Sequence, residues 1–279
     1  MATITLSEKF SPLVDEKFAA ESKKSLLTNQ NYNWIGAHAI NVYKVGTSSM
    51  NDYDRSASKS ENWSRFGAVA GLDATTQKMM LKNDRSFTFA IDKLDTDETQ
   101  AALQAATALE RQVREVVIPE VDAYTYGVMC EGAGIKPAAV ALTSENICGE
   151  IFKANTALDD AEVPETERYL VVTPAVYLLM KQSKDIFLET DVAEDMRLKG
   201  VIAMIDGAKV IKVPANRLPD GFGFMIAHPV ATVAPSKLTD YRVHNDPPGI
   251  SGDLVEGRIV YDAFVLDNKK NAIYYQATA

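Results

Sequence analysis

Apolar positions recur at three- and four-residue spacing over residues 95–126, which is the periodicity of a helix with one buried stripe. Asp95 is followed three residues later by Glu98, a pairing that satisfies free backbone amides where a helix starts. Pro119 should bend the helix, because proline lacks an amide proton and crowds the preceding turn. The pattern predicts one long helix whose buried stripe comprises Leu103, Ala106, Leu109, Val113, Val116 and Val117.

Two strands are expected before this helix. Residues 40–45 alternate between apolar and polar, and residues 78–92 do so again, with Phe87, Phe89 and Ile91 on one face. The interval 46–77 between them is polar and holds only isolated aromatic residues. A structureless loop of roughly thirty residues is unusual inside a compact domain. We therefore expect a hairpin-like protrusion whose aromatic side chains either dock on another surface or form a small local cluster.

A mixed α/β domain is predicted after the long helix. One helix should start at the cap residue Ser144, and another at Thr173, where Pro174 occupies the first helical position. Short apolar runs predict strands at 169–172, 210–213 and 224–227, and a C-terminal hairpin made of 259–266 and 272–275. The segment Asp-Pro-Pro-Gly at 246–249 should break the chain sharply.

The N-terminal residues 1–36 are polar with scattered apolar positions, among them Leu13, Phe18, Leu26 and Leu27. So few apolar residues cannot bury enough surface to offset the conformational entropy that the segment would lose by folding around a core of its own. The segment is therefore expected to be an arm that lies on other surfaces.

The composition limits the classes of function. The chain has 279 residues, 46% of them hydrophobic, which is enough for a substantial core. Its formal net charge of −9 argues against a surface that grips nucleic-acid phosphates, since such binding depends on clustered Lys and Arg. The sequence shows neither a signal-peptide pattern nor an apolar run long enough to span a bilayer. We therefore expect a soluble protein that is not exported.

Residues that commonly perform catalysis or bind metals are few. Cys130 and Cys148 lack zinc-site spacing and are expected to be reduced, buried thiols. The histidines His38, His228 and His244 form no metal-binding pattern, and His228, before a proline, suits a structural hydrogen bond. The sequence holds no nucleophile elbow, P-loop or dinucleotide-binding glycine motif. These observations favour a protein that is not an enzyme and has no cofactor and no metal site.

The order of several segments resembles the major capsid proteins of tailed bacteriophages, which have the Hong Kong 97-type capsid fold. The segments are 42–54 with Met-Asn-Asp-Tyr, 84–89, 117–122, 163–174, the glycines Gly200 and Gly207, 213–214 and 227–229. The resemblance implies an α+β fold in four parts. These parts are an N-terminal arm (1–39), an extended β-hairpin loop (40–92), a peripheral domain with a long spine helix (93–137 and 233–262) and an axial α/β domain (138–232 and 263–279).

The same resemblance implies a major capsid protein of the virion, made in the bacterial host cytoplasm. It would self-assemble as hexamers and pentamers into an icosahedral head shell that encloses phage double-stranded DNA without sequence-specific binding. Because the arm begins almost at Met1, a separate scaffolding protein, or none, is expected, together with a portal and no membrane partner. Lys59, Lys78 and Lys82 lie in the loop region, but no partner asparagine matches, so no covalent crosslink is assigned.

The loop and the arm are expected to bury their side chains against sister molecules. The candidate intersubunit contacts are Tyr53, Arg55, Trp63, Arg65 and Phe66. Trp63 could equally be a buried local anchor. Two other functions stay open: an encapsulin-like nanocompartment shell, which shares the fold but holds a protein cargo, and a small-molecule enzyme or binding domain built on the α/β half.

Overall fold

The structure is a computed structural model that describes residues 21–29, 31–32, 39–55, 64–67, 71, 74–98, 104–183 and 204–279. The chain divides into two compact units. The first comprises Met1–Ile35 and Leu81–Ala279, and the second comprises Gly36–Met80. Each is described by itself below.

The second unit contains a two-stranded antiparallel sheet, formed by β1 (Ala39–Val45) and β2 (Ala74–Met80). Ala39 lies opposite Met80, and Val45 lies opposite Ala74. The prediction of one strand over 78–92 was therefore wrong, because the chain leaves the hairpin at Met80 and starts a new strand at Asn83. The polar run Thr75-Thr76-Gln77 hid the first half of β2, since a strand segment exposed on both faces has no apolar alternation.

A three-stranded antiparallel sheet in the first unit has the order β3 (Asn83–Asp92), β10 (Gly252–Tyr261) and β9 (Ser236–Asn245). On β3 the predicted alternation is confirmed: Phe87 and Phe89 are half-buried and Ile91 is buried. These side chains and the buried Val255 form a small core against the helix at Ala105. The predicted chain break is a turn at residues 246–249 between β9 and β10, with Asp246 and Gly249 both at positive φ.

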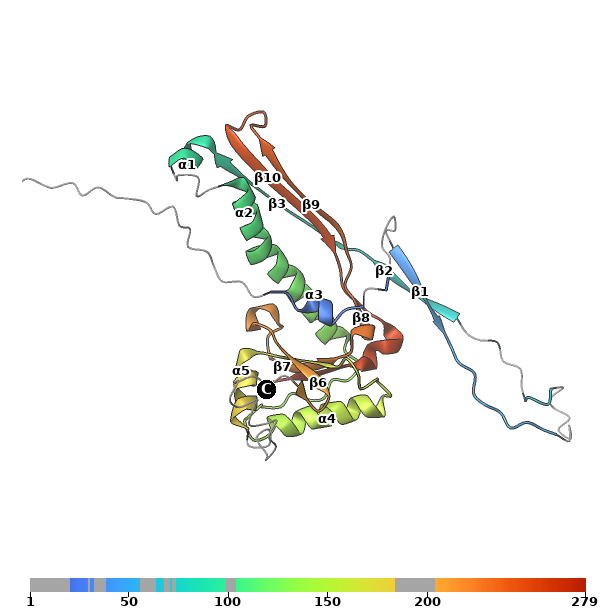
Figure 1. The fold of residues 1–279 in the computed structure, drawn as a ribbon. Helices are drawn as coiled ribbons and strands as arrows, with labels where there is room; N and C mark the ends of the chain where they lie inside the picture. Colours follow the sequence, from blue (N-terminus) through green and yellow to red (C-terminus); the bar gives the residue numbers. More distant parts are fainter. Residues whose placement is uncertain are drawn as a thin grey trace, which may run out of the picture. The chain divides into compact units, whose positions relative to one another are not determined.

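The long helix differs from its prediction in both position and register. Lys93–Glu98 forms the short helix α1, and a second start occurs at Gln104, whose backbone is extended. From there α2 (Ala105–Gln112), a π-helical segment η2 (Val113–Val117) and α3 (Ile118–Gly132) follow without a break, as the green ribbon in Figure 1 shows. The rod therefore covers 105–132 instead of 95–126.

The π-helical segment has a local cause. Within it the amide of Ile118 bonds to the carbonyl of Val113, five residues back. Pro119 follows immediately and has no amide to offer the carbonyl four residues before it, so a widened turn relieves the crowding that proline causes. Two residues of the predicted buried stripe, Ala106 in α2 and Val116 in the π-helical segment, are exposed. Leu103, the first residue of that stripe, lies outside the described residues.

The five-stranded sheet has the order β12 (Ile273–Ala277), β7 (Phe222–Ala227), β4 (Tyr169–Val172), β6 (Ala208–Lys212) and β5 (Met204–Ile205). Among the pairings of these described strands, only that of β4 with β6 is parallel. Alternate residues serve opposite faces. Leu170 and Val172 pack with the helices α4 (Ile147–Asp160) and α5 (Pro174–Gln182), whereas Val171 packs with α3. Both faces of this sheet are therefore buried.

The remaining elements are short. Strand β8 (Thr232–Val233) pairs with β11 (Phe264–Val265). Within the described ranges the 3-10 helices are η1 (Lys24–Leu26), η4 (Ala215–Arg217), η5 (Pro229–Ala231) and η6 (Asp267–Ala272). The predicted C-terminal hairpin was wrong. Of its first strand, predicted over 259–266, residues 259–261 end β10 and Phe264–Val265 form β11, and its second strand is β12, which pairs with β7. The turn predicted at 267–271 is the 3-10 helix η6, which connects β11 to β12 instead of joining two paired strands.

The two predicted caps had different outcomes. The Thr173 side chain accepts a hydrogen bond from the amide of Val176, and Pro174 opens α5, as expected. Ser144 is not the cap of α4, which begins at Ile147 after Asn146. The Asn146 amide group instead bonds to the backbone of Thr143 and Ala141 and so fixes the preceding turn.

The N-terminal segment at residues 21–29 packs on its own chain. Leu27 is fully buried in the core between α3 and the five-stranded sheet, and the amide of Asn29 donates to the carbonyl of Thr232 over 2.7 Å. The Ser22 hydroxyl donates to Asp122 on α3, which also pairs with the buried Arg217 at 2.9 Å. For this segment the prediction of an arm lying on sister molecules was wrong, and residues 1–20 lie outside the described residues.

Candidate interaction surfaces

The loop that follows β1 presents an exposed pair of aromatic rings. Tyr53 and Phe66 meet edge to face with centroids 5.0 Å apart, and their residues are 50% and 75% exposed. Edge-to-face contact is a favourable arrangement for two rings. Here it holds both rings together while leaving most of the Phe66 surface uncovered.

Backbone contacts fix this pair in place. The amide of Asp54 donates to the carbonyl of Arg65 over 3.0 Å, and the Asn51 side chain donates to the carbonyl of Phe66 over 3.3 Å. The amide of Phe66 in turn donates to the Ser64 hydroxyl. Gly67 then turns the chain at φ +94°, a conformation that glycine adopts without strain. The two ends of the loop are therefore joined at the aromatic pair.

The structure brings together four of the five candidate contact residues. Arg55 and Arg65 are exposed beside Tyr53 and Phe66, at the two positions where the described loop ends meet. Trp63, the fifth candidate, lies outside the described residues. The same unit also exposes Tyr43, Val45 and Met50. This unit therefore exposes apolar side chains both on strand β1 and in the loop that follows it.

A second candidate surface lies in the first unit, where the π-helical segment faces the three-stranded sheet. A hollow of about 170 Å³ opens there between the helix and strands β3 and β10. Its apolar walls are Phe87, Val116, Val117, Val121, Ile259 and Tyr261. Sequence reasoning missed this hollow, although Pro119 in the middle of a helical pattern was a signal for irregular backbone at this place.

Charged groups line one edge of the hollow. Glu120 accepts a hydrogen bond from the Arg85 guanidinium at 2.9 Å and another from the Tyr261 hydroxyl at 3.2 Å. Burial, followed by the nearby Glu120 charge, raises the pKa of Tyr261 to about 12. The hydroxyl therefore stays protonated at neutral pH and acts as a donor to the carboxylate.

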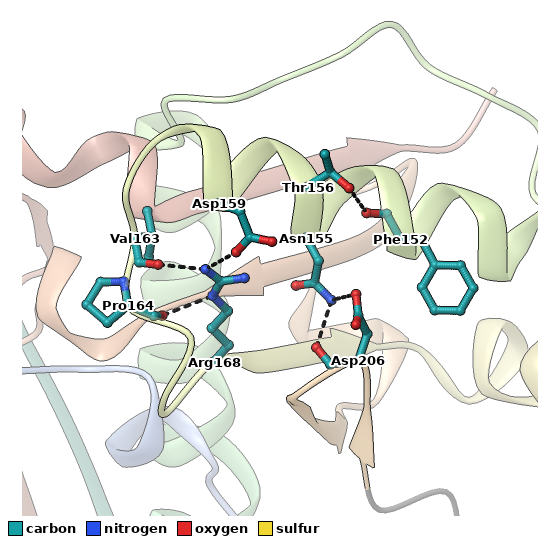
Figure 2. A network of polar contacts seen from close by, with 8 residues as sticks. All are labelled: Phe152, Asn155, Thr156, Asp159, Val163, Pro164, Arg168 and Asp206. Carbon is teal, nitrogen blue, oxygen red and sulfur yellow. Dashed lines mark hydrogen bonds and ion pairs between the residues drawn. The ribbon is translucent and has the colours of Figure 1, made fainter.

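A polar network around α4 fixes the loops next to it and offers no reactive group. Figure 2 shows the buried Arg168 side chain pointing toward Asp159, to which it pairs at 2.6 Å, and toward the carbonyls of Val163 and Pro164. Asn155 on the same helix donates to both the backbone and the side-chain oxygens of Asp206. The donors joined by these contacts meet protein acceptors, which indicates a structural role.

The Asn155 contact holds a tight turn. Asp206 and Gly207 join β5 to β6 with φ values of +46° and +75°, which is the conformation of a two-residue hairpin turn with Asp-Gly. An Asn155 amide bonded to this turn fixes the end of β6 against α4.

The histidine and cysteine side chains also have structural surroundings. His228 accepts a hydrogen bond at Nδ1 from the amide of Val230, as predicted, and burial lowers its pKa. His38 lies outside the described residues. Both cysteines are free and buried, and burial raises the pKa of Cys130 to about 12. Such a thiol stays protonated at neutral pH and is a poor nucleophile.

The described part of the chain has neither a cluster of metal ligands nor a helix suited to a membrane. No three His, Cys, Asp or Glu side chains there gather closely enough to hold a metal ion. Within the same ranges, no helix combines the length and the apolar character needed to cross a bilayer.

Comparison with solved structures gives matches along nearly the whole chain. A structure from Mycobacterium phage Che8 aligns with a TM-score of 0.80 at 18% identity, covering 97% of this chain and 96% of that one. The capsid structure of the cyanophage P-SCSP1u aligns with a TM-score of 0.76 at 13% identity, covering 98% and 93%. The chain has the fold of phage capsid structures.

A third match supports the same fold. The mature capsid of bacteriophage PhiM1 aligns with a TM-score of 0.73 at 12% identity, covering 99% of this chain and 92% of that one. No protein-family model matches the sequence, and no curated protein does. With identities this low, the likeness to phage capsids is one of fold, mixed in helix and sheet as the sequence predicted.

Proposed function

We propose that this chain is the major capsid protein of a tailed bacteriophage, with the Hong Kong 97-type fold, and that it self-assembles into an icosahedral shell around double-stranded DNA. One observation carries the proposal: the chain matches phage capsid structures over nearly the full length of both partners. A match that included only the five-stranded half would fit many functions, because one fold hosts many activities. Here the hairpin and the long helix are included as well.

The parts of the chain acquire roles under this proposal. The helix and the three-stranded sheet, within 93–137 and 233–262, would form the peripheral domain. The five-stranded sheet, within 138–232 and 263–279, would form the axial domain at the centres of hexamers and pentamers. Residues 40–92 would supply the extended loop and 1–39 the N-terminal arm. Of that arm, residues 21–29 hold on to their own subunit through Leu27, so we assign contacts with a neighbour to the other residues of the arm.

Assembly would be distributed over many modest interfaces. Closed symmetry makes them cooperative, because each added subunit completes several contacts at once. The exposed side chains of the second unit, including Tyr53 and Phe66, supply apolar surface for such contacts. The net charge of −9 suits a lining that does not retain DNA by attraction to its phosphates. The proposed role is structural and requires no catalysis, and the proposed partners are further copies, a separate scaffolding protein and a portal.

The test is to express the full chain in bacteria and examine the purified protein by electron microscopy. We expect closed shells, tubes or rings of capsomers. A chain that stays monomeric over a wide range of concentration, both alone and with a scaffolding protein from the same virus, would overturn the proposal. Particles that hold a protein cargo and exclude DNA would instead support a nanocompartment shell.

A single substitution tests the loop. Replacing Trp63 by Ala should lower the yield of particles while the subunit keeps its circular dichroism spectrum. An unchanged particle yield would argue against the loop as a docking element.

A further inference from the structure

The chain passes from the second unit to the first through a link of two residues. Strand β2 ends at Met80 and β3 begins at Asn83. Leu81 and Lys82 therefore belong to neither strand, and the boundary between the two compact units falls between Met80 and Leu81. On the side of the first unit the link is firmly held. Leu81 is buried, and the amide of Lys82 donates to Oδ2 of Asp262 over 2.9 Å.

Asp262 is a buried carboxylate that accepts hydrogen bonds from three donors. Its residue is 3% exposed. Besides the bond from Lys82 at Oδ2, its Oδ1 accepts from the Tyr124 hydroxyl over 2.7 Å and from the amide of Ala263 over 2.8 Å. Burying a carboxylate is costly unless it is hydrogen-bonded, and bonds to a charged group are stronger than those between neutral groups. The link before β3, the helix α3 and the segment after β10 are thus joined at one side chain.

The neighbours of Asp262 fix the direction of its carboxylate. The bond from Ala263 joins adjacent residues and so limits rotation of the carboxyl group. The Tyr124 ring lies edge to face with Tyr261, with centroids 5.7 Å apart, which orients its hydroxyl. Burial, followed by the bond to Asp262, raises the pKa of Tyr124, so this hydroxyl is protonated at neutral pH and donates. With Oδ1 occupied in this way, Oδ2 is directed to Lys82.

A carboxylate suits this position and a neutral amide does not. An asparagine side chain has one oxygen that accepts and one NH₂ group that donates. In one orientation the NH₂ group would face the amide of Lys82, and in the other it would face the donors of Tyr124 and Ala263. Two donors that face each other in a buried place are both left without an acceptor. The contact with Lys82 therefore depends on the charged side chain.

We propose that Asp262 is a positioning residue for assembly, which clamps the chain at Lys82 so that movement of the second unit ends at the link and does not enter β3. The inference rests on the proposed capsid function, in which the second unit supplies contacts between copies. A segment whose root is already fixed loses less entropy when it binds a neighbour. The clamp therefore lowers the concentration at which copies assemble.

Amide hydrogen exchange in the unassembled full chain tests the clamp directly. In Asp262→Asn, exchange at residues 81–83 should be at least about tenfold faster than in the parent chain, because the amide of Lys82 loses a charged acceptor. Asp220→Asn, at an exposed residue of the same unit, is the matched control and should leave this rate unchanged. Tyr124→Phe removes one donor and keeps both carboxylate oxygens, so it should raise the rate less. It tests the clamp even where Asp262→Asn does not fold.

A second measurement separates a clamp from a bond that only stabilises the fold. A thiol-reactive fluorophore is placed on Tyr43→Cys in β1, or on Leu178→Cys in α5, both at exposed positions, while the native cysteines are buried and stay in place. We expect Asp262→Asn to increase the amplitude of the nanosecond wobble of the label on β1 and to leave that of the label on α5 unchanged. Equal wobble of the label on β1 in the parent chain and in Asp262→Asn would overturn the clamp.

Assembly followed by light scattering and electron microscopy completes the test. Asp262→Asn should raise the lowest concentration that gives particles by at least about threefold, and particles formed above it should have the parent's size, because the contacts between copies are unchanged. Faster exchange at Lys82 with an unchanged threshold would overturn the positioning role and leave the capsid function standing. A parent chain that never assembles would overturn the capsid function, and the role of Asp262 in assembly with it.

Discussion

The five-stranded sheet and the β1–β2 hairpin place their apolar side chains in opposite environments. All six residues of β7 are buried, and the sheet around it is covered by α4 and α5 on one face and by α3 on the other. The hairpin has only two strands, and Tyr43 and Val45 on β1 are exposed. A two-stranded ribbon is marginal by itself in water. One region therefore supplies its own core, while the other leaves apolar side chains in contact with water.

The largest effect expected is the contrast between two phenylalanines, one in each region. Phe224→Ala in the centre of β7 should lower the free energy of unfolding by about 3–5 kcal/mol, because it leaves a cavity among fully buried side chains. Phe66→Ala should change the same quantity by less than about 0.5 kcal/mol, because its ring is mostly in water. Urea titration of both variants measures the difference. Equal losses in the free energy of unfolding would show that the hairpin has a core of its own, and the two regions would then not differ in this respect.

A buried ion pair gives the next effect. Arg217→Ala leaves Asp122 charged and buried without its guanidinium, although the Ser22 hydroxyl still donates to it. Loss of one partner of a buried pair costs about 3–5 kcal/mol. The matched double variant Asp122→Asn with Arg217→Met, which removes both charges, should be more stable than Arg217→Ala alone in urea. A double variant less stable than the single one would contradict this explanation.

Two adjacent leucines test whether the N-terminal segment belongs to the self-sufficient region. Leu27 is fully buried in the core at α3, whereas its neighbour Leu26 is 43% exposed. Leu27→Ala should cost about 2–5 kcal/mol and speed protease cleavage near residue 22. Leu26→Ala is the control and should stay within about 0.5 kcal/mol of the parent chain. If both variants behave alike, the segment is not anchored where the structure places it.

The smallest effect is a dependence of stability on pH at His228. Burial lowers its pKa, partly opposed by Glu167 and reinforced by Arg168 and Lys269, so the folded chain binds fewer protons here than the unfolded chain does. His228 makes its full contribution to the free energy of unfolding when the pH is above the pKa of the unfolded chain, about 6.5, and this contribution decreases as the pH falls below that value. Protonation also removes the Nδ1 acceptor for the amide of Val230.

The variant His228→Asn isolates that contribution. An asparagine oxygen can accept the same amide bond but does not titrate. We expect the midpoint of thermal unfolding to fall less between about pH 7 and 5.5 in this variant than in the parent chain. Identical slopes would assign the pH dependence to other groups.

Local signals in the sequence predicted the local structure well. Thr173-Pro174 specified the start of α5 because the cap and the proline act within one turn. The run Tyr169–Val172 specified β4 because four apolar residues in a row fit a strand buried on both faces. The alternation at Phe87, Phe89 and Ile91 gave the buried face of β3. None of these required knowledge of a distant partner.

Pairing over long distances could not be predicted in the same way. The residues near Ile273 contain no signal that β12 pairs with β7 instead of with the strand predicted at 259–266. The helix was placed too early because Asp95 and Glu98 do lie in a helix, although it is the short α1, and the second start at Gln104 has no capping side chain. Of the candidate site, the contact between Tyr53 and Phe66 fits the small local cluster that isolated aromatics in a polar loop left open. The hollow was not predicted, because it depends on how the helix meets β10.

The π-helical turn also sets how the two ends of the rod face their neighbours. In this segment the backbone hydrogen bond joins residues five positions apart, whereas in a regular α-helix it joins residues four positions apart. The chain between α2 and α3 therefore contains one residue more than a regular helix would. Each helical residue advances the side-chain direction by about 100°. Deleting one residue from Val113–Val117 would thus turn Tyr126 and Met129 away from the five-stranded sheet whenever Ala105 keeps its place on Val255. The length of this short segment therefore keeps two cores, built from different side chains, in register with each other.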